Sequence, residues 1–229
     1  MRVQLMALAI LAFSISVNHV FCQNDCYGLY EKEIAIDELK TWQLLGHGEV
    51  SSWANQLSLK ESDDSKGVML LSPEIYQQDV IIRYSVMALT HATVVVTMLS
   101  VSDTGKSTEL AIPDDYDGNI GLWYNEKENY FFAFNNAPHN RTPFIRKNPN
   151  AEKALVMADR NHMQSGIYYR IEIGIKDGSI WLKIDDKEIL NGYDEKLLEG
   201  GRIAIRLRGT AGFKAGCLIK EMTICSTKK

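Results

Sequence analysis

Hydrophobic and polar side chains alternate one by one through much of the chain, which is the pattern of strands buried on one face. The clearest case is residues 202–208, where three aliphatic side chains fall on one face and Arg206 and Arg208 on the other. Residues 169–175 and 180–185 alternate in the same way, and the Asp-Gly step between them is typical of a tight turn. These segments predict three half-buried strands, two of them joined as a β-hairpin.

Many further short strands are expected, separated by polar turns. The pattern predicts them at residues 29–35, 42–45, 48–53, 67–72, 79–89, 93–101, 122–124, 130–134 and 217–225. Only residues 36–40 and 151–157 have a brief helical pattern. Short strands at intervals of about 8–12 residues, without a long amphipathic helix, predict an all-β sandwich of two sheets of the jelly-roll kind.

The first 22 residues have the pattern of an export signal. Arg2 precedes an apolar stretch, and compact side chains at Val20 and Cys22 offer a cleavage site before Gln23. The apolar stretch is shorter than the roughly 20 residues that a membrane span needs. We therefore expect a signal peptide at residues 1–22, no integral membrane span, and an exported domain, periplasmic or extracellular, at residues 23–229. A lipid anchor on Cys22 is the alternative, which the bulky Phe21 disfavours.

Export places the remaining cysteines, Cys26, Cys217 and Cys225, where disulfides persist. Cys217 and Cys225 lie in one predicted strand, too far apart along it to form a bond. The favoured pair is Cys26 with one of these two, and Cys225 best fits a fold whose terminal strands run antiparallel side by side. Three buried free thiols remain the alternative.

Composition and charge narrow the possible partners. The chain has 229 residues, 45% hydrophobic and 24% charged, with a formal net charge of -4. This balance is that of a globular protein, and it lacks the positive excess by which nucleic-acid binders displace phosphate counterions. We therefore expect no nucleic-acid partner, and an acidic ligand would have to meet a local cluster of cations.

Residues 135–150 interrupt the rhythm of the strands. They contain three of the five prolines together with His139, Arg141, Arg146 and Lys147. A long polar loop of this composition is predicted here, and such loops are usually either functional or mobile.

Five segments, in order and spacing, resemble a known family. They read Leu-Tyr-Glu at 29–31, Gly-His-Gly-Glu-Val at 46–50, Phe-Ile-Arg-Lys-Asn-Pro-Asn at 144–150, Ile-Lys-Asp-Gly at 175–178 and Gly-Gly-Arg-Ile-Ala-Ile-Arg at 200–206. This set looks like the YesU-like family, bacterial proteins of uncharacterised function in the concanavalin A-like lectin/glucanase superfamily. The resemblance implies a jelly roll of two curved antiparallel sheets with a concave saccharide-binding face, in proteins often associated with plant or algal polysaccharide breakdown. It implies no particular reaction.

Known reactions on this architecture leave the question of catalysis open. Retaining glycosidases of the laminarinase type carry Glu-x-Asp-x-x-Glu on one strand, because two carboxyl groups must stand about 5 Å apart. That pattern does not occur in this sequence. The motifs of jelly-roll alginate lyases are also absent, although His139, Tyr130, Arg141 and Lys147 have the chemistry of a base, an acid and a carboxylate clamp.

Saccharide binding needs aromatic faces for the sugar ring and planar donors for its oxygens. The aromatic candidates are Trp42, Trp53, Trp123, Tyr124 and Trp181, and the polar ones are Arg141, Arg146, Lys147, Asn148, Arg206 and Arg208. The competing interpretation is that the tryptophans are core residues and that the alternating arginines form a solvated strand face. The predicted ligand-binding set is Trp123, Tyr124, His139, Arg141, Arg146, Lys147 and Asn148. Of these, Arg146 and Lys147 are expected to contact the ligand.

No cofactor is expected, with calcium as the one alternative. Residues 114–119 offer three Asp and one Asn around a glycine turn, which suits Ca²⁺, but they lack the bidentate Glu of an EF-hand. The Asp-Gly step is equally an ordinary turn. We therefore predict no metal ligands, and zinc is disfavoured because the histidines are scattered.

Two functional hypotheses follow. In the first, a secreted carbohydrate-active protein binds or acts on a polysaccharide or oligosaccharide, as a glycoside hydrolase or a lyase. In the second, it is a non-catalytic, lectin-like binding protein. Two carboxyl groups about 5 to 9 Å apart in the groove would favour a glycosidase. A His or Tyr beside an Arg pair would favour a lyase, and aromatic residues without a proton-transfer pair would favour binding alone.

Overall fold

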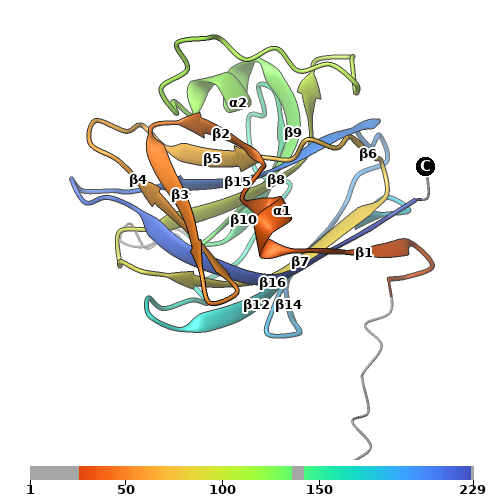
Figure 1. Cartoon of the computed structure of the whole chain (residues 1–229). Helices are drawn as coiled ribbons and strands as arrows, with labels where there is room; N and C mark the ends of the chain where they lie inside the picture. Colours follow the sequence, from red (N-terminus) through yellow and green to blue (C-terminus); the bar gives the residue numbers. More distant parts are fainter. Residues whose placement is uncertain (1–25, 136–141, 228–229) are drawn as a thin grey trace, which may run out of the picture.

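The protein is an all-β sandwich of two antiparallel sheets, seen in a computed structural model that describes residues 26–135 and 142–227 (Figure 1). The predicted signal peptide, His139 and Arg141 lie outside the described residues. The all-β jelly-roll prediction is confirmed.

Each sheet is built from strands far apart in the sequence. The first sheet has the order β14 (Lys187–Tyr193), β13 (Ser179–Ile184), β12 (Tyr168–Lys176), β7 (Val80–Ala88), β16 (Gly216–Ser226), β4 (Gln56–Glu61) and β3 (Gly48–Trp53), with β1 (Tyr30–Ile34) paired to β16. The second sheet has the order β11 (Val156–Met157), β10 (Phe144–Asn148), β9 (Lys127–Phe134), β8 (Val94–Asp103), β15 (Gly200–Arg208), β5 (Val68–Leu71) and β2 (Gln43–Gly46), with β6 (Tyr76–Gln77) paired to β15. Two short helices, α1 (Ile36–Leu39) and α2 (Gly121–Asn125), complete the described elements.

The main core lies between the two sheets, and strand alternation accounts for it. On β15 the three aliphatic side chains Ile203, Ile205 and Leu207 are fully buried against the first sheet. The predicted hairpin is also confirmed, since β12 and β13 pair from Ile171 opposite Ile184 to the turn. Both turn residues between them have positive φ, which Asp-Gly tolerates well.

The chain ends are joined as expected. β1 runs antiparallel beside β16, with Glu31 opposite Cys225. Cys26 forms a disulfide with Cys225, so the favoured pairing is confirmed, and Cys217 is a buried free thiol on the same strand.

Several predicted boundaries were wrong. Residues 122–124 form part of α2 rather than a strand, because Trp123 and Tyr124 close a helical turn onto the carbonyl of Ile120. Residues 151–157 contain the strand β11 at their end and no helix. The segment 135–150 is not wholly loop, because its second half is the strand β10, paired with β9. The strands β4, β6, β10, β11 and β14 were not predicted. No helix within the described residues is long and apolar enough to cross a membrane.

Candidate functional site

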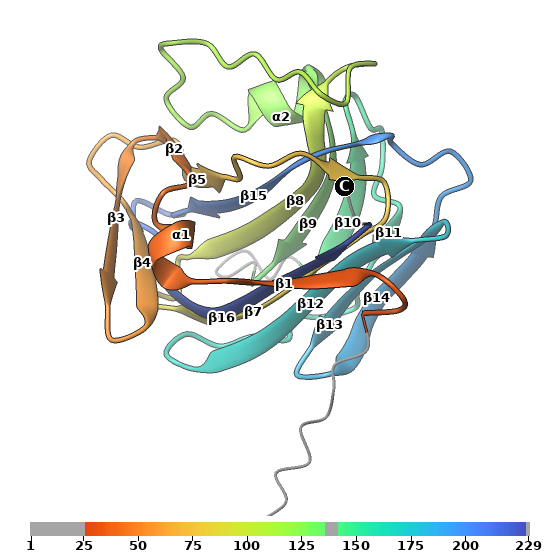
Figure 2. The same cartoon turned by 45° about the vertical axis from the view of Figure 1, so that its right-hand side comes forward.

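The outer face of the second sheet is partly covered by the segment 104–125, which links β8 to β9 and contains α2 (Figures 1 and 2). This covered face forms a second apolar cluster, which includes Val96, Met98, Phe131 and Trp123. Trp123 is fully buried there, and its Nε1 donates a hydrogen bond of 2.6 Å to the hydroxyl of Tyr116. The segment is therefore packed onto the sheet by its own aromatic residues.

Two glycines allow this segment to approach the turn between β4 and β5. The backbones of Gly67 and Gly118 are so close that a Cβ on Gly118 would overlap the carbonyl of Gly67. Both residues have positive φ, and the amide of Lys66 donates to the carbonyl of Asp117 at 3.2 Å. Only glycine fits this close contact without strain.

Beside this contact lies a cavity of about 390 Å³ on the outer face of the second sheet. It is lined by β8, β9, β10, β15 and the two contacting loops. Its apolar and aromatic lining consists of Val94, Val96, Ile120, Tyr124, Phe131, Ala133 and Phe144. Its polar lining consists of Lys66, Asn119, Arg206, Arg208 and Thr210. An apolar surface with a few convergent polar groups is the usual form of a small-ligand site.

The aromatic rings of the cavity pack on one another. The ring of Tyr124 meets that of Phe131 edge-on with centroids 5.1 Å apart, and Phe131 is stacked on Phe144 at 6.0 Å. The guanidinium of Arg146 lies 4.7 Å from the centroid of the Tyr124 ring. Arg146 also donates to the carbonyl of Ala151. The contacts with Phe131 and Arg146 fix the position of the Tyr124 side chain.

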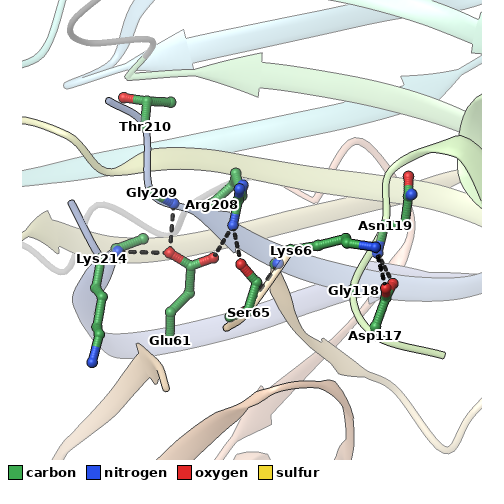
Figure 3. A network of polar contacts seen from close by, with 12 residues as sticks. Glu61, Ser65, Lys66, Asp117, Gly118, Asn119, Arg208, Gly209, Thr210 and Lys214 are labelled. Carbon is green, nitrogen blue, oxygen red and sulfur yellow. Dashed lines mark hydrogen bonds and ion pairs between the residues drawn. The ribbon is translucent and has the colours of Figure 1, made fainter. Parts of the chain in front are cut away.

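Two carboxylates form ion pairs with cationic side chains that line the cavity (Figure 3). The carboxylate of Glu61 is almost fully buried and accepts a hydrogen bond of 3.2 Å from Arg208, together with the amides of Gly209 and Ala215. Arg208 donates in addition to the carbonyl of Ser65. Next to this network, Lys66 pairs with Asp117 at 2.7 Å. That ion pair and the hydrogen bond from the Asn119 amide keep the pKa of Asp117 below its usual range.

Arg206 differs from its neighbour Arg208 because the segment 104–125 covers it. The residue is only 4% exposed, and its Nη2 donates to the carbonyls of Lys66 and Gly118 at 2.8 Å each. Its burial lowers the pKa of the guanidinium. The alternation correctly predicted which face Arg206 occupies, but the expectation of a solvated face fails at this residue.

The predicted ligand-binding residues do not form one group. Tyr124 lines the cavity, whereas Arg146 contacts the Tyr124 ring and does not itself line the cavity. Trp123 is buried beneath the segment, and Asn148 is buried with its amide donating to Asn129 at 3.0 Å. His139 and Arg141 lie outside the described residues.

Lys147 lies on the other face of the same sheet. Its ammonium pairs with Asp194 at 2.7 Å, and the hydroxyl of Tyr130 donates to the same carboxylate at 2.6 Å. Burial and the negative charge of Asp194 raise the pKa of Tyr130. The structure therefore places Lys147 and Tyr130 in a network that joins β9 and β10 to the loop before β15, away from the cavity.

The other aromatic candidates are dispersed. Trp42 belongs to the main core, and Trp181 packs on the outer face of the first sheet with Tyr27 and the disulfide. Trp53 is 82% exposed at the end of β3. Lys66 and Thr210 line the cavity but were not identified, and Asn119 was considered only as a possible calcium ligand. All three lie in turns whose positions depend on contacts distant in sequence.

The proposed calcium segment offers little as a metal site. Within the described ranges, no group of three or more His, Cys, Asp or Glu side chains is arranged to hold a metal ion. Asp117 is paired with Lys66, and the Asn119 side chain accepts the amide of Gly121 at 2.8 Å.

Comparison with known proteins gives the fold but no close relative. No protein-family model matches the sequence, and no curated protein matches it. A Bacillus subtilis protein of unknown function with a galectin-like fold superposes with a TM-score of 0.71 at 15% identity, over 87% of this chain and 97% of that one. The carbohydrate-binding module CBM66 from B. subtilis gives 0.55 at 12% identity, over 82% and 97%. A prokaryotic β-1,3-1,4-glucanase (lichenase) from a mouse hindgut metagenome gives 0.57 at 10% identity, over 87% and 99%.

These similarities support the architecture that the sequence resemblance implied. The sandwich is shared with a structure of galectin-like fold and with a glucanase structure. The narrower assignment to the YesU-like family has no support from a family model. At identities of 10–15%, the shared property is the fold.

Proposed function

We propose that this chain is a carbohydrate-binding protein and that the cavity on the outer face of the second sheet is its saccharide site. The observation that carries this proposal is the combination of a packed aromatic surface at Tyr124 and Phe131 with the planar donor Arg208. Sugar rings stack their C–H faces on aromatic rings, while their hydroxyls and carboxylates take hydrogen bonds from Arg and Asn. Two of the structurally similar proteins carry a carbohydrate-binding or glucanase name, which agrees with this use of the fold.

Binding without hydrolysis is the better supported form of this proposal. Among the described residues that line the cavity there is no Asp, Glu or His. The nearby carboxylates Glu61 and Asp117 are already bonded to cations and backbone amides. A retaining glycosidase needs one carboxyl group to attack and another to protonate, about 5 Å apart across the bond.

A glycan array followed by calorimetric titration of the best ligands tests the proposal. Tyr124→Ala should weaken saccharide binding by about tenfold, because one stacked ring contributes on the order of 1 kcal/mol or more. Tyr193→Ala is the matched control, because Tyr193 is an exposed tyrosine on β14 of the first sheet. Equal binding by both variants and the unmodified protein would place the saccharide elsewhere. Failure of every glycan to bind would reject the function.

A lyase is the second candidate, because Tyr124 shares the cavity with Arg206 and Arg208. In such a reaction a base removes the proton at C-5 of a uronate and the C-4–oxygen bond breaks. A proton then passes to the leaving oxygen, and the product is an unsaturated uronate. A tyrosine can transfer these protons, and arginines can neutralise the carboxylate. Unsaturated products from pectic or algal polysaccharides, abolished by Tyr124→Phe, would establish this activity; their absence with binding retained would leave a binding protein.

We also propose that the protein is exported and belongs to the YesU-like family. The Cys26–Cys225 disulfide supports export, since such bonds persist in oxidising compartments. Expression of the full chain with fractionation of cells, followed by mass determination of the mature protein, tests both export and cleavage before Gln23. An intact chain found only in the cytoplasm would contradict the proposal.

A further inference from the structure

The cavity carries an excess of positive charge. Three cationic side chains line it, Lys66, Arg206 and Arg208. Two carboxylates contact them, Glu61 and Asp117, and neither of these lines the cavity. The three cations therefore contribute to the wall of the cavity, whereas the two carboxylates do not.

Both carboxylates are fully engaged in this position. One oxygen of Glu61 accepts from Arg208, and the other accepts the amides of Gly209 and Ala215 at 2.6 and 2.8 Å. One oxygen of Asp117 pairs with Lys66, and the other accepts the amide of Asn119 at 3.0 Å. Neither is free to turn toward a ligand and repel a negative group.

Arg206 is a buried cation without an ion pair. Within the described residues no carboxylate lies at ion-pair distance from it, and its Nη2 donates to two backbone carbonyls. The Tyr116 hydroxyl and, at longer range, the charge of Glu61 are its other favourable interactions. Its Nε is buried and has no hydrogen-bond partner among the described residues. A buried cation without an anionic partner is costly, so a protein that keeps one at the wall of a cavity gains when an anion occupies that cavity.

We propose that this cavity selects saccharides that carry an anionic oxygen group, either the carboxylate of a uronate or a sulfate ester. This inference rests on the proposed function and specifies its ligand class. The anionic group lies against Lys66 and Arg208, with the buried charge of Arg206 behind it, and the sugar ring lies over Tyr124. Arginine suits this role because its planar donors match carboxylate and sulfate oxygens.

Matched ligand pairs test the inference on the unmodified protein. One pair is an oligogalacturonide and its fully methyl-esterified form, and the other is a sulfated galactan oligosaccharide and its desulfated form. At low ionic strength the charged member should bind at least about tenfold more tightly than its neutral counterpart, as charge-assisted hydrogen bonds are gained. The difference should shrink as salt is added. The pair with the larger difference identifies the anionic group.

A charge-removing variant locates the selectivity. Lys66→Gln should weaken binding of the charged member severalfold more than binding of the neutral member, so the preference for the charged member should fall. Lys106→Gln is the matched control, since Lys106 is similarly exposed (58% against 56%) and likewise paired with one carboxylate, but does not line the cavity.

The two possible failures are distinguishable. If neutral and charged members bind equally and Tyr124→Ala weakens both, the saccharide site stands and the selection for an anionic group is wrong. If neither pair of ligands binds and no other glycan binds, the proposed function and this inference are both wrong.

Discussion

Arg146 and Lys147 are adjacent on β10, yet their charged groups lie on opposite faces of the second sheet. Arg146 lies over the ring of Tyr124 on the outer face, whereas Lys147 pairs with Asp194 on the other side. Successive side chains of a strand point to opposite faces, so the two cations of the Arg-Lys-Asn-Pro stretch cannot contact one ligand in the same way. We therefore predict that replacing Arg146 affects ligand binding and that replacing Lys147 affects stability.

Replacement of Lys147 should destabilise the fold. Lys147→Met leaves the partly buried Asp194 without its cation, so the free energy of unfolding should fall by about 1–3 kcal/mol. Denaturant titration of the variant and the unmodified protein measures this change. Saccharide affinity of the folded variant should be unaltered, and a selective loss of affinity at full stability would contradict the assignment.

Replacement of Arg146 should lower the affinity for saccharide. Arg146→Met removes the cation that lies 4.7 Å from the Tyr124 ring centroid, so the ring becomes less fixed at the edge of the cavity. We expect saccharide affinity to fall about three- to tenfold, equivalent to roughly 0.6–1.4 kcal/mol. Calorimetric titration measures this loss. Unchanged affinity would show that the Arg146 contact does not order the binding surface.

The ion pair of Asp194 should make stability depend on pH. Burial opposes ionisation of this carboxyl, but hydrogen bonds from Lys147 and Tyr130 outweigh it and hold the pKa of Asp194 below its usual range. A carboxyl whose pKa is lowered by folding stabilises the protein above its unfolded pKa of about 4, and this stability is lost as the pH falls through the folded pKa. Asp194→Asn should therefore destabilise the protein at pH 7 and flatten the decline in acid. Parallel pH profiles for the two proteins would contradict this.

The sequence predicted the strands that local alternation defines and the pairing of the terminal strands, but it did not predict how the irregular segments pack on the sheets. The buried face of β15 and the β12–β13 hairpin follow from period-two patterns, and the pairing of Cys26 with Cys225 follows from the expected order of the terminal strands. The burial of Arg206 does not, because an irregular segment with no periodicity covers it. The approach of Gly118 to Gly67 creates that cover and brings Lys66 to the cavity. Nothing near either glycine in the sequence indicates the other.

The contact between Gly67 and Gly118 should be essential for the cavity. Gly118→Ala would place a Cβ onto the carbonyl of Gly67 and strain a residue with a φ of +92°, so the segment 104–125 should no longer dock as observed. We expect loss of saccharide binding and a larger loss of stability than in Gly105→Ala. Gly105 also has a positive φ, but its Cβ would meet nothing within 4 Å, so this control measures backbone strain alone, about 1–2 kcal/mol. Equal stability and binding for the two variants would show that the close contact is dispensable.

The disulfide should stabilise the chain, while the third cysteine should stay unreactive until the protein unfolds. The bond joins Cys26 to Cys225 across a sequence separation of 199 residues, and loss of such a bond typically costs about 2–5 kcal/mol. Cys26→Ser with Cys225→Ser should therefore unfold at a lower denaturant concentration than the oxidised protein. Burial raises the pKa of the Cys217 thiol to about 12, so it should not react with a thiol reagent at pH 8 in the folded protein. In the oxidised protein that begins at Gln23, which lacks Cys22, one thiol should become reactive on denaturation, and Cys217→Ala should abolish that signal. Rapid labelling of the native protein, or three reactive thiols after denaturation, would contradict this pairing.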